Sequence, residues 1–146
     1  MLPENLELEI VTPERHMLDE TVDYVEVPGK EGYMGILPGH APLLSELGMG
    51  TLFYRKGGQS EYFAVLGGFA EVLPGRVIVL ADACERAGEI NIDRAREALE
   101  RAKSELSKGG AADKNAAEIT LALDRAQARL EAASKAGTVA TAATQR

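Results

Sequence analysis

The residues of this chain change in kind near Gly88, and that division limits what the chain can fold into. All seven aromatic residues, all six prolines and 12 of the 15 glycines lie at or before Gly88, whereas 16 of the 22 alanines lie after it. Aromatic residues favour strands, proline and glycine favour turns, and alanine has the highest helix propensity. We therefore expect two structural units, one built of strands and one built of helices.

Net charge divides at the same place and limits the partners of the chain. Residues 1–88 hold 6 basic and 14 acidic side chains, giving −8, and residues 89–146 hold 10 and 9, giving +1. The total of −7 argues against binding to nucleic acid. No apolar run reaches the roughly 18 residues of a membrane span, and the N-terminus lacks the features of a signal peptide. We expect a chain on the cytoplasmic side with no direct membrane insertion.

Residues 1–88 show the alternation and the turn signals of short strands. Leu6–Ile10 alternates apolar and acidic residues, as a strand with one buried face does. Pro74-Gly75 suits a type II turn, and Gly67-Gly68 predicts a bulge or a close backbone approach between strands. Further strands are expected over 22–27, 51–55, 61–66, 69–73 and 76–81. Short strands with frequent turns predict an all-β sandwich or barrel.

Residues 89–135 predict two helices that pair as a hairpin. Asn91 suits the N-cap of the first helix, and Asn115 with Glu118 forms a capping-box pattern for the second. Apolar residues recur at helical spacing in both, and the break at 108–113 is short, so the two helices should be antiparallel. Residues 136–146 show no period, and we expect them to fray.

The apolar stripes of both helices consist mostly of alanine, which buries little area. At about 25 cal/mol per Å², such a stripe attaches a helix less strongly than leucine or phenylalanine would. We therefore expect a well-formed hairpin that is weakly attached to the β unit, which makes it a candidate moving part.

Residue patterns for catalysis or metal binding are scarce. His16 and His40 are the only histidines, and they lack the spacing of a metal site. No serine lies in a nucleophile elbow, and the single cysteine, Cys84, follows an apolar strand and is expected to be a small core residue. We expect no catalytic residue and no metal site.

The segment 31–44 concentrates the special residues of the chain. Its three glycines and two prolines fix a rigid loop, and Tyr33, Ile36 and Leu37 give it apolar mass. Such loops carry function more often than core residues do, so we expect a surface that contacts another protein. The alternative is that these residues only turn the chain and close one end of the sandwich.

Three segments together resemble the epsilon subunit of the bacterial F-type ATP synthase. They are Glu-Gly-x-x-Gly-Ile-x-Pro-Gly-His-Ala-Pro-Leu-Leu at 31–44, Leu-Gly-Gly-Phe-Ala-Glu-Val at 66–72 and Val-Leu-Ala-Asp at 79–82. The resemblance covers about residues 6–135. It implies a β-sandwich of about ten strands over 1–88, a mobile regulatory hairpin of two antiparallel helices over 89–135, and a frayed tail over 136–146.

The resemblance also implies a function. The chain would be a non-catalytic central-stalk, or rotor, subunit of a proton-translocating synthase, coupling rotation of the membrane ring to ATP synthesis. It would lie at the cytoplasmic face of the bacterial inner membrane, peripherally, against the gamma subunit and the c-ring. Its extended hairpin would reach the catalytic alpha and beta subunits and restrain ATP hydrolysis. A free-standing ATP-sensing module is the alternative. The residues assigned to the rotor interface are Tyr33, Gly35, Ile36, Pro38, His40 and Pro42.

The hairpin partly matches the pattern Ile/Leu-Asp-x-x-Arg-Ala, by which some epsilon subunits bind ATP. Residues 92–96 match its first five positions, and Glu97 replaces the final alanine. On the second helix two arginines stand four residues apart and project from one face. ATP would be a regulatory ligand, and no other cofactor is expected. The alternative is a set of solvated charges paired along their helices. The residues assigned to ATP are Ile92, Asp93, Arg96, Arg125 and Arg129.

Overall fold

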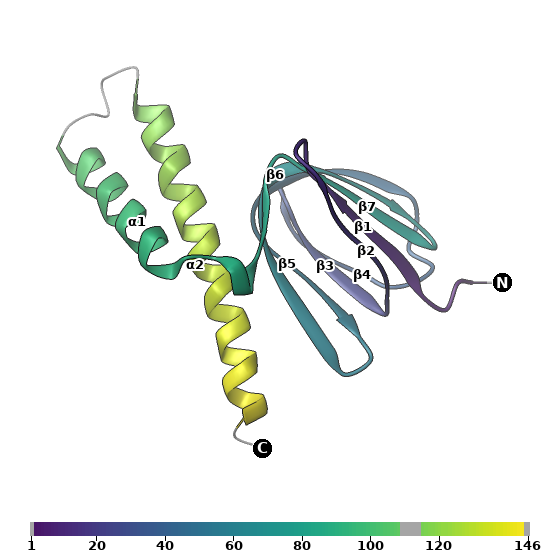
Figure 1. The fold of residues 1–146 in the computed structure, drawn as a ribbon. Coiled ribbons are helices and arrows are strands. Elements are labelled where there is room, and N and C mark those ends of the chain that lie inside the picture. The colour runs from purple at the N-terminus through teal and green to yellow at the C-terminus, as the bar shows by residue number, and fades with distance from the viewer. Residues whose placement is uncertain (1, 109–114, 145–146) are drawn as a thin grey trace.

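The computed structural model describes residues 2–108 and 115–144, with the backbone alone for 138–144. Strands occupy the first part of the chain and helices the second (Figure 1). The strands are β1 (Leu6–Val11), β2 (His16–Val22), β3 (Tyr24–Gly29), β4 (Gly32–Ile36), β5 (Leu43–Lys56), β6 (Gln59–Leu73), β7 (Arg76–Ala81) and β8 (Cys84–Arg86). A single 3-10 turn, η1 (Ala87–Glu89), precedes the helices α1 (Ile92–Ser107) and α2 (Ala116–Thr144).

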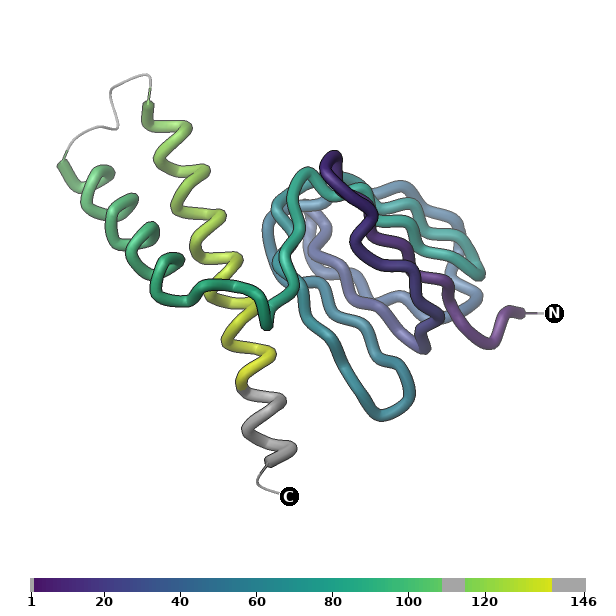
Figure 2. The backbone as a smooth tube through the Cα atoms, viewed as in Figure 1, coloured from purple at the N-terminus to yellow at the C-terminus, as the bar shows by residue number. Residues whose placement is uncertain are grey.

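The strands form one sheet that curls over a common core. Its order is β2-β1-β7-β6-β5-β3-β4, with β8 paired to β6. Neighbouring strands are antiparallel except β1 and β7, which run parallel. Two layers of the curled sheet face each other, as the backbone trace in Figure 2 shows. The expected fold class, a β-sandwich followed by an antiparallel helical hairpin, is confirmed.

The core of the sandwich lies between these layers and takes alternate residues from each strand. In β1, Leu6, Leu8 and Ile10 are fully buried, and the acidic residues between them are not. Phe63 on β6 is the largest fully buried side chain. The predicted alternation of residues 6–10 is therefore confirmed, and the hydrophobic effect drives closure of the sandwich.

β5 and β6 are long strands, and β6 changes its partner at a glycine pair. Gly67 and Gly68 have φ of +86° and +128°, which L side chains rarely adopt. A Cβ on Gly68 would lie 2.1 Å from the carbonyl oxygen of Leu80. Before this point β6 pairs with β8, and after it with β7. The predicted close approach is confirmed. Because the two long strands each fill two positions, the structure has eight strands among the described residues where about ten were expected.

The two helices of the hairpin begin at the predicted caps, and the second is longer than predicted. The Asn91 side chain caps α1 by accepting a hydrogen bond from the Arg94 N–H at 3.0 Å. α2 begins directly after Asn115. The predicted end of regular structure near residue 135 is wrong, since α2 continues to Thr144. Residues 136–144 lack an apolar period, but alanine favours helix without one. Residues 109–114 and 145–146, in the predicted break and tail, lie outside the described residues.

α2 lies between α1 and the sandwich and packs on β5 and β6 (Figure 1). The centre of the contact is made of small side chains: buried Ala132 packs against Ala64 on β6 and Ala87 on η1. Tyr62, Ile90 and Ala136 surround this cluster. Alanine at these positions lets the helix approach the sheet closely but removes little apolar area from water.

We predict that the sandwich folds without the hairpin, because all its large core side chains come from β1–β8. A fragment ending at Gly88 should unfold in one cooperative transition and keep its near-UV circular dichroism, measured beside the full chain. A fragment with far-UV but no near-UV signal would be a molten globule and would contradict this division.

Candidate functional site

Apolar side chains are exposed together on the outer face of the sandwich. Phe69 on β6 is paired with Leu80 on β7, and their exposed fractions are 50% and 55%. Val11 on β1 is paired with Leu80 on its other side. Ile78 and the 70%-exposed Leu44 lie in the next row, on either side of Glu71. We call Val11, Leu44, Phe69, Ile78 and Leu80 the outer apolar patch. Exposed Glu71 interrupts this second row, whereas the row of Phe69, Leu80 and Val11 is apolar throughout. A group of exposed apolar side chains on a sheet face marks a candidate site of interaction with another protein.

One end of the sandwich carries a second exposed surface, formed by the loop after β4 and the N-terminal residues. The Gly39 N–H donates a hydrogen bond of 2.7 Å to the carbonyl of Pro74, which ties this loop to the β6–β7 turn. Gly39 has a φ of +89°, and Leu2 packs over it. The exposed apolar residues here are Leu2, Leu37 and Leu43, at 75%, 61% and 41%. We call this surface the sandwich end.

Four of the six residues predicted for the rotor interface lie on or beside this end. Pro38 and His40 are half-buried and Pro42 is exposed in the loop itself. The ring Nδ1 of His40 lies 2.7 Å from the carbonyl oxygen of Ala41. Gly35 is exposed on β4, where a Cβ would lie 2.3 Å from the hydroxyl of Tyr24. The glycine at 35 therefore has a packing reason.

The other two predicted interface residues lie away from this end. Ile36 is fully buried in the sandwich core, so it holds the loop from inside. Tyr33 is 47% exposed and lies beside the hairpin: its hydroxyl accepts a hydrogen bond from the Thr51 N–H at 3.2 Å, and the Lys135 Nζ of α2 lies 5.2 Å from its ring centre. An apolar loop residue looks the same in sequence whether it points inward, outward or toward another unit.

A cleft of about 410 Å³ lies where the hairpin joins the sandwich. β8 and η1 form one wall, the start of α1 the second and Arg129 of α2 the third. The Arg129 Nε donates hydrogen bonds to both carboxylate oxygens of Glu85, at 3.2 and 3.0 Å. The residues that line the cleft are Glu85, Glu89, Ile90, Asn91, Arg94, Ala95, Ala98 and Arg129. Two acidic and two basic side chains thus face one space between the two units.

The cleft gathers a set of residues that differs from the predicted nucleotide residues. Of the five assigned, Arg129 alone lines it; Arg125 is exposed one turn earlier on α2. Ile92, Asp93 and Arg96 are exposed on α1. Arg94 lines the cleft instead, because residues two apart on a helix face nearly opposite directions. On this segment the residues that line the cleft are Ile90, Asn91, Arg94 and Ala95.

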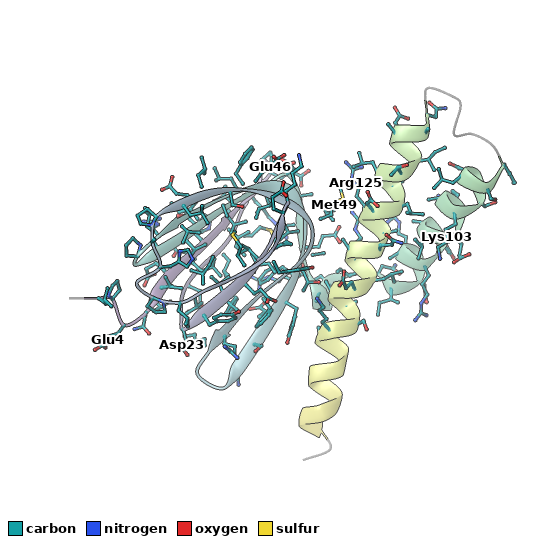
Figure 3. All side chains as sticks on the ribbon, turned by 180° about the vertical axis from the view of Figure 1, so that it is seen from behind. Glu4, Asp23, Glu46, Met49, Lys103 and Arg125 are labelled. Atoms are coloured by element: carbon teal, nitrogen blue, oxygen red, sulfur yellow. The ribbon has the colours of Figure 1, made fainter. Side chains whose placement is uncertain are left out.

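That set matches the pattern Ile/Leu-Asp-x-x-Arg-Ala two residues earlier, with Asn91 in place of the aspartate. Both registers begin with an isoleucine; the later one has the aspartate, at 93, and the earlier one has the final Arg-Ala pair, at 94 and 95. Lys103 is exposed on α1 (Figure 3), and its Nζ lies 3.8 Å from a carboxylate oxygen of Glu100.

β8 connects the two units through two neighbouring side chains. Arg86 forms an ion pair with Glu61, which also accepts a hydrogen bond from the Tyr54 hydroxyl. Arg86 also donates to the Met17 carbonyl at 3.2 Å. Burial, and then the hydrogen bond to Glu61, raises the pKa of Tyr54 above its ordinary value. Glu85, the preceding residue, reaches Arg129 on α2. Arg86 is thus held by the sandwich, and Glu85 by the hairpin.

Among the described residues, no cluster of side chains is suited to hold a metal ion, and no helix has the length and hydropathy to cross a membrane. Cys84 is buried, and burial raises the pKa of its thiol to about 12. Since the thiolate is the nucleophile, Cys84 is unreactive at neutral pH. Its predicted place in the core is confirmed.

Comparison with known proteins finds similarity along both units. Residues 5–87 match the family described as "ATP synthase, Delta/Epsilon chain, beta-sandwich domain", and residues 89–134 match "ATP synthase, Delta/Epsilon chain, long alpha-helix domain". The ATP synthase epsilon chain of Solibacter usitatus is 52% identical over 134 residues, 92% of this chain and 99% of that protein. That of Syntrophobacter fumaroxidans is 49% identical over 137 residues, with the same coverage.

Among solved structures, the fold is similar to a chain of the Euglena gracilis mitochondrial ATP synthase, in a structure of OSCP, F1 and c-ring. The TM-score is 0.71 with 24% identity, covering 95% of this chain and 83% of that one. At this identity the likeness is one of fold.

Proposed function

Because the chain belongs to the family of ATP synthase epsilon chains, we propose that it is a non-catalytic subunit of the central stalk of a proton-translocating synthase. It lies peripherally at the cytoplasmic face of the membrane and couples rotation of the ring to ATP synthesis. The observation that carries this proposal is the outer apolar patch, which a chain acting alone would expose to water. A free-standing ATP sensor is therefore not favoured.

The proposal assigns the two exposed surfaces to two partners. The outer apolar patch binds the gamma subunit, since a broad apolar face suits a long-lived interface between subunits. The sandwich end binds the c-ring through the rigid loop that holds Pro38, His40 and Pro42. A loop fixed by glycine and proline is already ordered before binding, so little conformational entropy is lost when it docks.

The hairpin is the mobile element of this proposal. Its contact with the sandwich is centred on small side chains, with Tyr62 and Ile90 beside them, and includes the Glu85–Arg129 ion pair and the approach of Lys135 to Tyr33. When undocked and extended, it reaches the catalytic alpha and beta subunits and restrains ATP hydrolysis.

We also propose that the cleft binds ATP as a regulatory ligand. Arg94 and Arg129 come from different helices and face one space, so both guanidinium groups can contact the same phosphate chain. Phosphate would compete with Glu85 for Arg129. Because the ligand contacts both helices and the sandwich, it stabilises the docked hairpin, by about 2.7 kcal/mol at a hundredfold excess over its Kd.

We predict that replacing Phe69 and Leu80 together by serine prevents binding to the gamma subunit. Both side chains are half exposed, so the free energy of unfolding should change by less than about 1 kcal/mol. Co-purification with tagged gamma subunit measures binding, and thermal unfolding measures stability. Leu121→Ser, at a 38%-exposed apolar residue on the hairpin, is the matched control and should bind normally. Normal binding by the double variant would contradict the assignment of the patch.

For the sandwich end, we predict that His40→Ala with Pro42→Ala weakens attachment to the c-ring and leaves gamma binding intact. Both side chains lie outside the main core, so the melting temperature of the isolated chain should fall little. Attachment is measured as the fraction of chain retained by detergent-solubilised synthase. Full retention with a lowered melting temperature would show that these residues only close the sandwich.

For the cleft, we predict that Arg94→Ala abolishes ATP binding and Arg96→Ala leaves it unchanged. Only Arg94 faces the cleft, and the two arginines are otherwise matched in type, exposure and helix. Isothermal titration of the full chain with millimolar ATP measures binding, with Arg129→Ala as a second loss variant. Equal losses at 94 and 96 would contradict the register. If the unaltered chain gave no heat with ATP, these arginines would be ordinary surface charges. Any inhibition by the hairpin would then not depend on ATP bound at this cleft.

A further inference from the structure

Thr51 lies on β5, one of the two strands that α2 packs against, with its hydroxyl unpaired. Its side chain is 1% exposed, and its Oγ1 is the buried side-chain polar atom without a hydrogen-bond partner among the described residues. The neighbouring Leu52 belongs to the sandwich core, so Thr51 points to the opposite face of β5. Its cross-strand partner is Ala64, which packs against Ala132 of α2.

The covering of Thr51 depends on the hairpin. Two positions earlier on the same face of β5, Met49 lines a groove with Ala128 and Glu131 of α2, and Figure 3 shows it pointing toward that helix. On the other flank Tyr33, which accepts the hydrogen bond of the Thr51 backbone N–H, lies against Lys135. If α2 left this face, the Thr51 hydroxyl would reach water.

A buried hydroxyl without a partner loses the hydrogen bonds that water gives it, so the loss counts against the docked state alone. Valine has nearly the same shape as threonine but has no hydroxyl, so it loses no hydrogen bond when it is buried. The Glu85–Arg129 ion pair acts in the opposite direction, since it exists only when the hairpin is docked.

We propose that Thr51 destabilises the docked state of the hairpin. The free energies of the docked and undocked states are thereby kept close to each other. This inference rests on the proposed mobility of the hairpin and adds the residue that sets its equilibrium. Glu85 and Arg129 favour the docked state, and Thr51 favours the undocked one.

The test measures the undocked fraction in the full chain without nucleotide. A cysteine at Ala132, which is 0% exposed, is labelled by a thiol reagent only when α2 leaves the sheet; Cys84→Ala removes the native thiol. Thr51→Val should lower the labelling rate about tenfold. Thr51→Ser, which keeps the hydroxyl, should not lower it, and Glu85→Gln should raise it.

The outcomes separate this inference from the proposed function. If Glu85→Gln raises labelling while Thr51→Val matches Thr51→Ser, the hairpin moves but Thr51 does not set its equilibrium. If labelling in every variant follows global unfolding in denaturant, the hairpin does not undock in the free chain, and its proposed mobility fails as well. Urea unfolding of each variant checks that the sandwich itself is intact.

Discussion

The close approach of β6 and β7 at Gly67-Gly68 is the constraint on which the arrangement of the molecule depends. Before the glycines, odd-numbered residues such as Phe63 and Val65 face the core; after them, even-numbered Ala70 and Val72 do. Only glycine allows this change of face, because its φ is positive and no Cβ fits against Leu80. The outer face of β6 thereby has two parts, one covered by α2 and one open as the outer apolar patch.

The two parts use different chemistry on the same outer face of the sandwich. The part that α2 covers carries Ala64 on β6, with Tyr62 packed beside it, and the buried Thr51 hydroxyl on β5, so the free energy of helix attachment is modest. The open part carries Phe69 on β6 and Leu80 on β7, both half exposed. Under the proposed function, this face offers a reversible surface to the hairpin of its own chain and a lasting one to another subunit. β8 adds the connection, with Arg86 fixed in the sandwich and Glu85 directed to the helix.

The fold could be predicted further than the site. Alternation in β1, the cap at Asn91 and the glycine pair are local signals, and each appears in the structure where the sequence placed it. The direction of a loop side chain is not local: nothing near Ile36 in sequence tells that it turns into the core, and nothing near Tyr33 tells that it meets α2. Arg94 and Arg96 differ by about half a helical turn, so a shift of two residues in the register of the motif decides which of them faces the cleft. The tail of α2 was missed because alanine keeps a helix without an apolar stripe.

The parallel pairing of β1 with β7 has a consequence for the order in which the chain folds. Leu8 pairs with Val77, almost at the other end of the β unit, and β1 separates β2 from the rest of the sheet. During synthesis, the β1–β2 hairpin therefore has no hydrogen-bonded sheet neighbour until β7 has left the ribosome, and completion of the sheet requires a contact of long sequence separation. α1 and α2 pair locally and form quickly once made. The slow step of folding thus belongs to the sandwich, and the hairpin has a finished surface to meet only after that step.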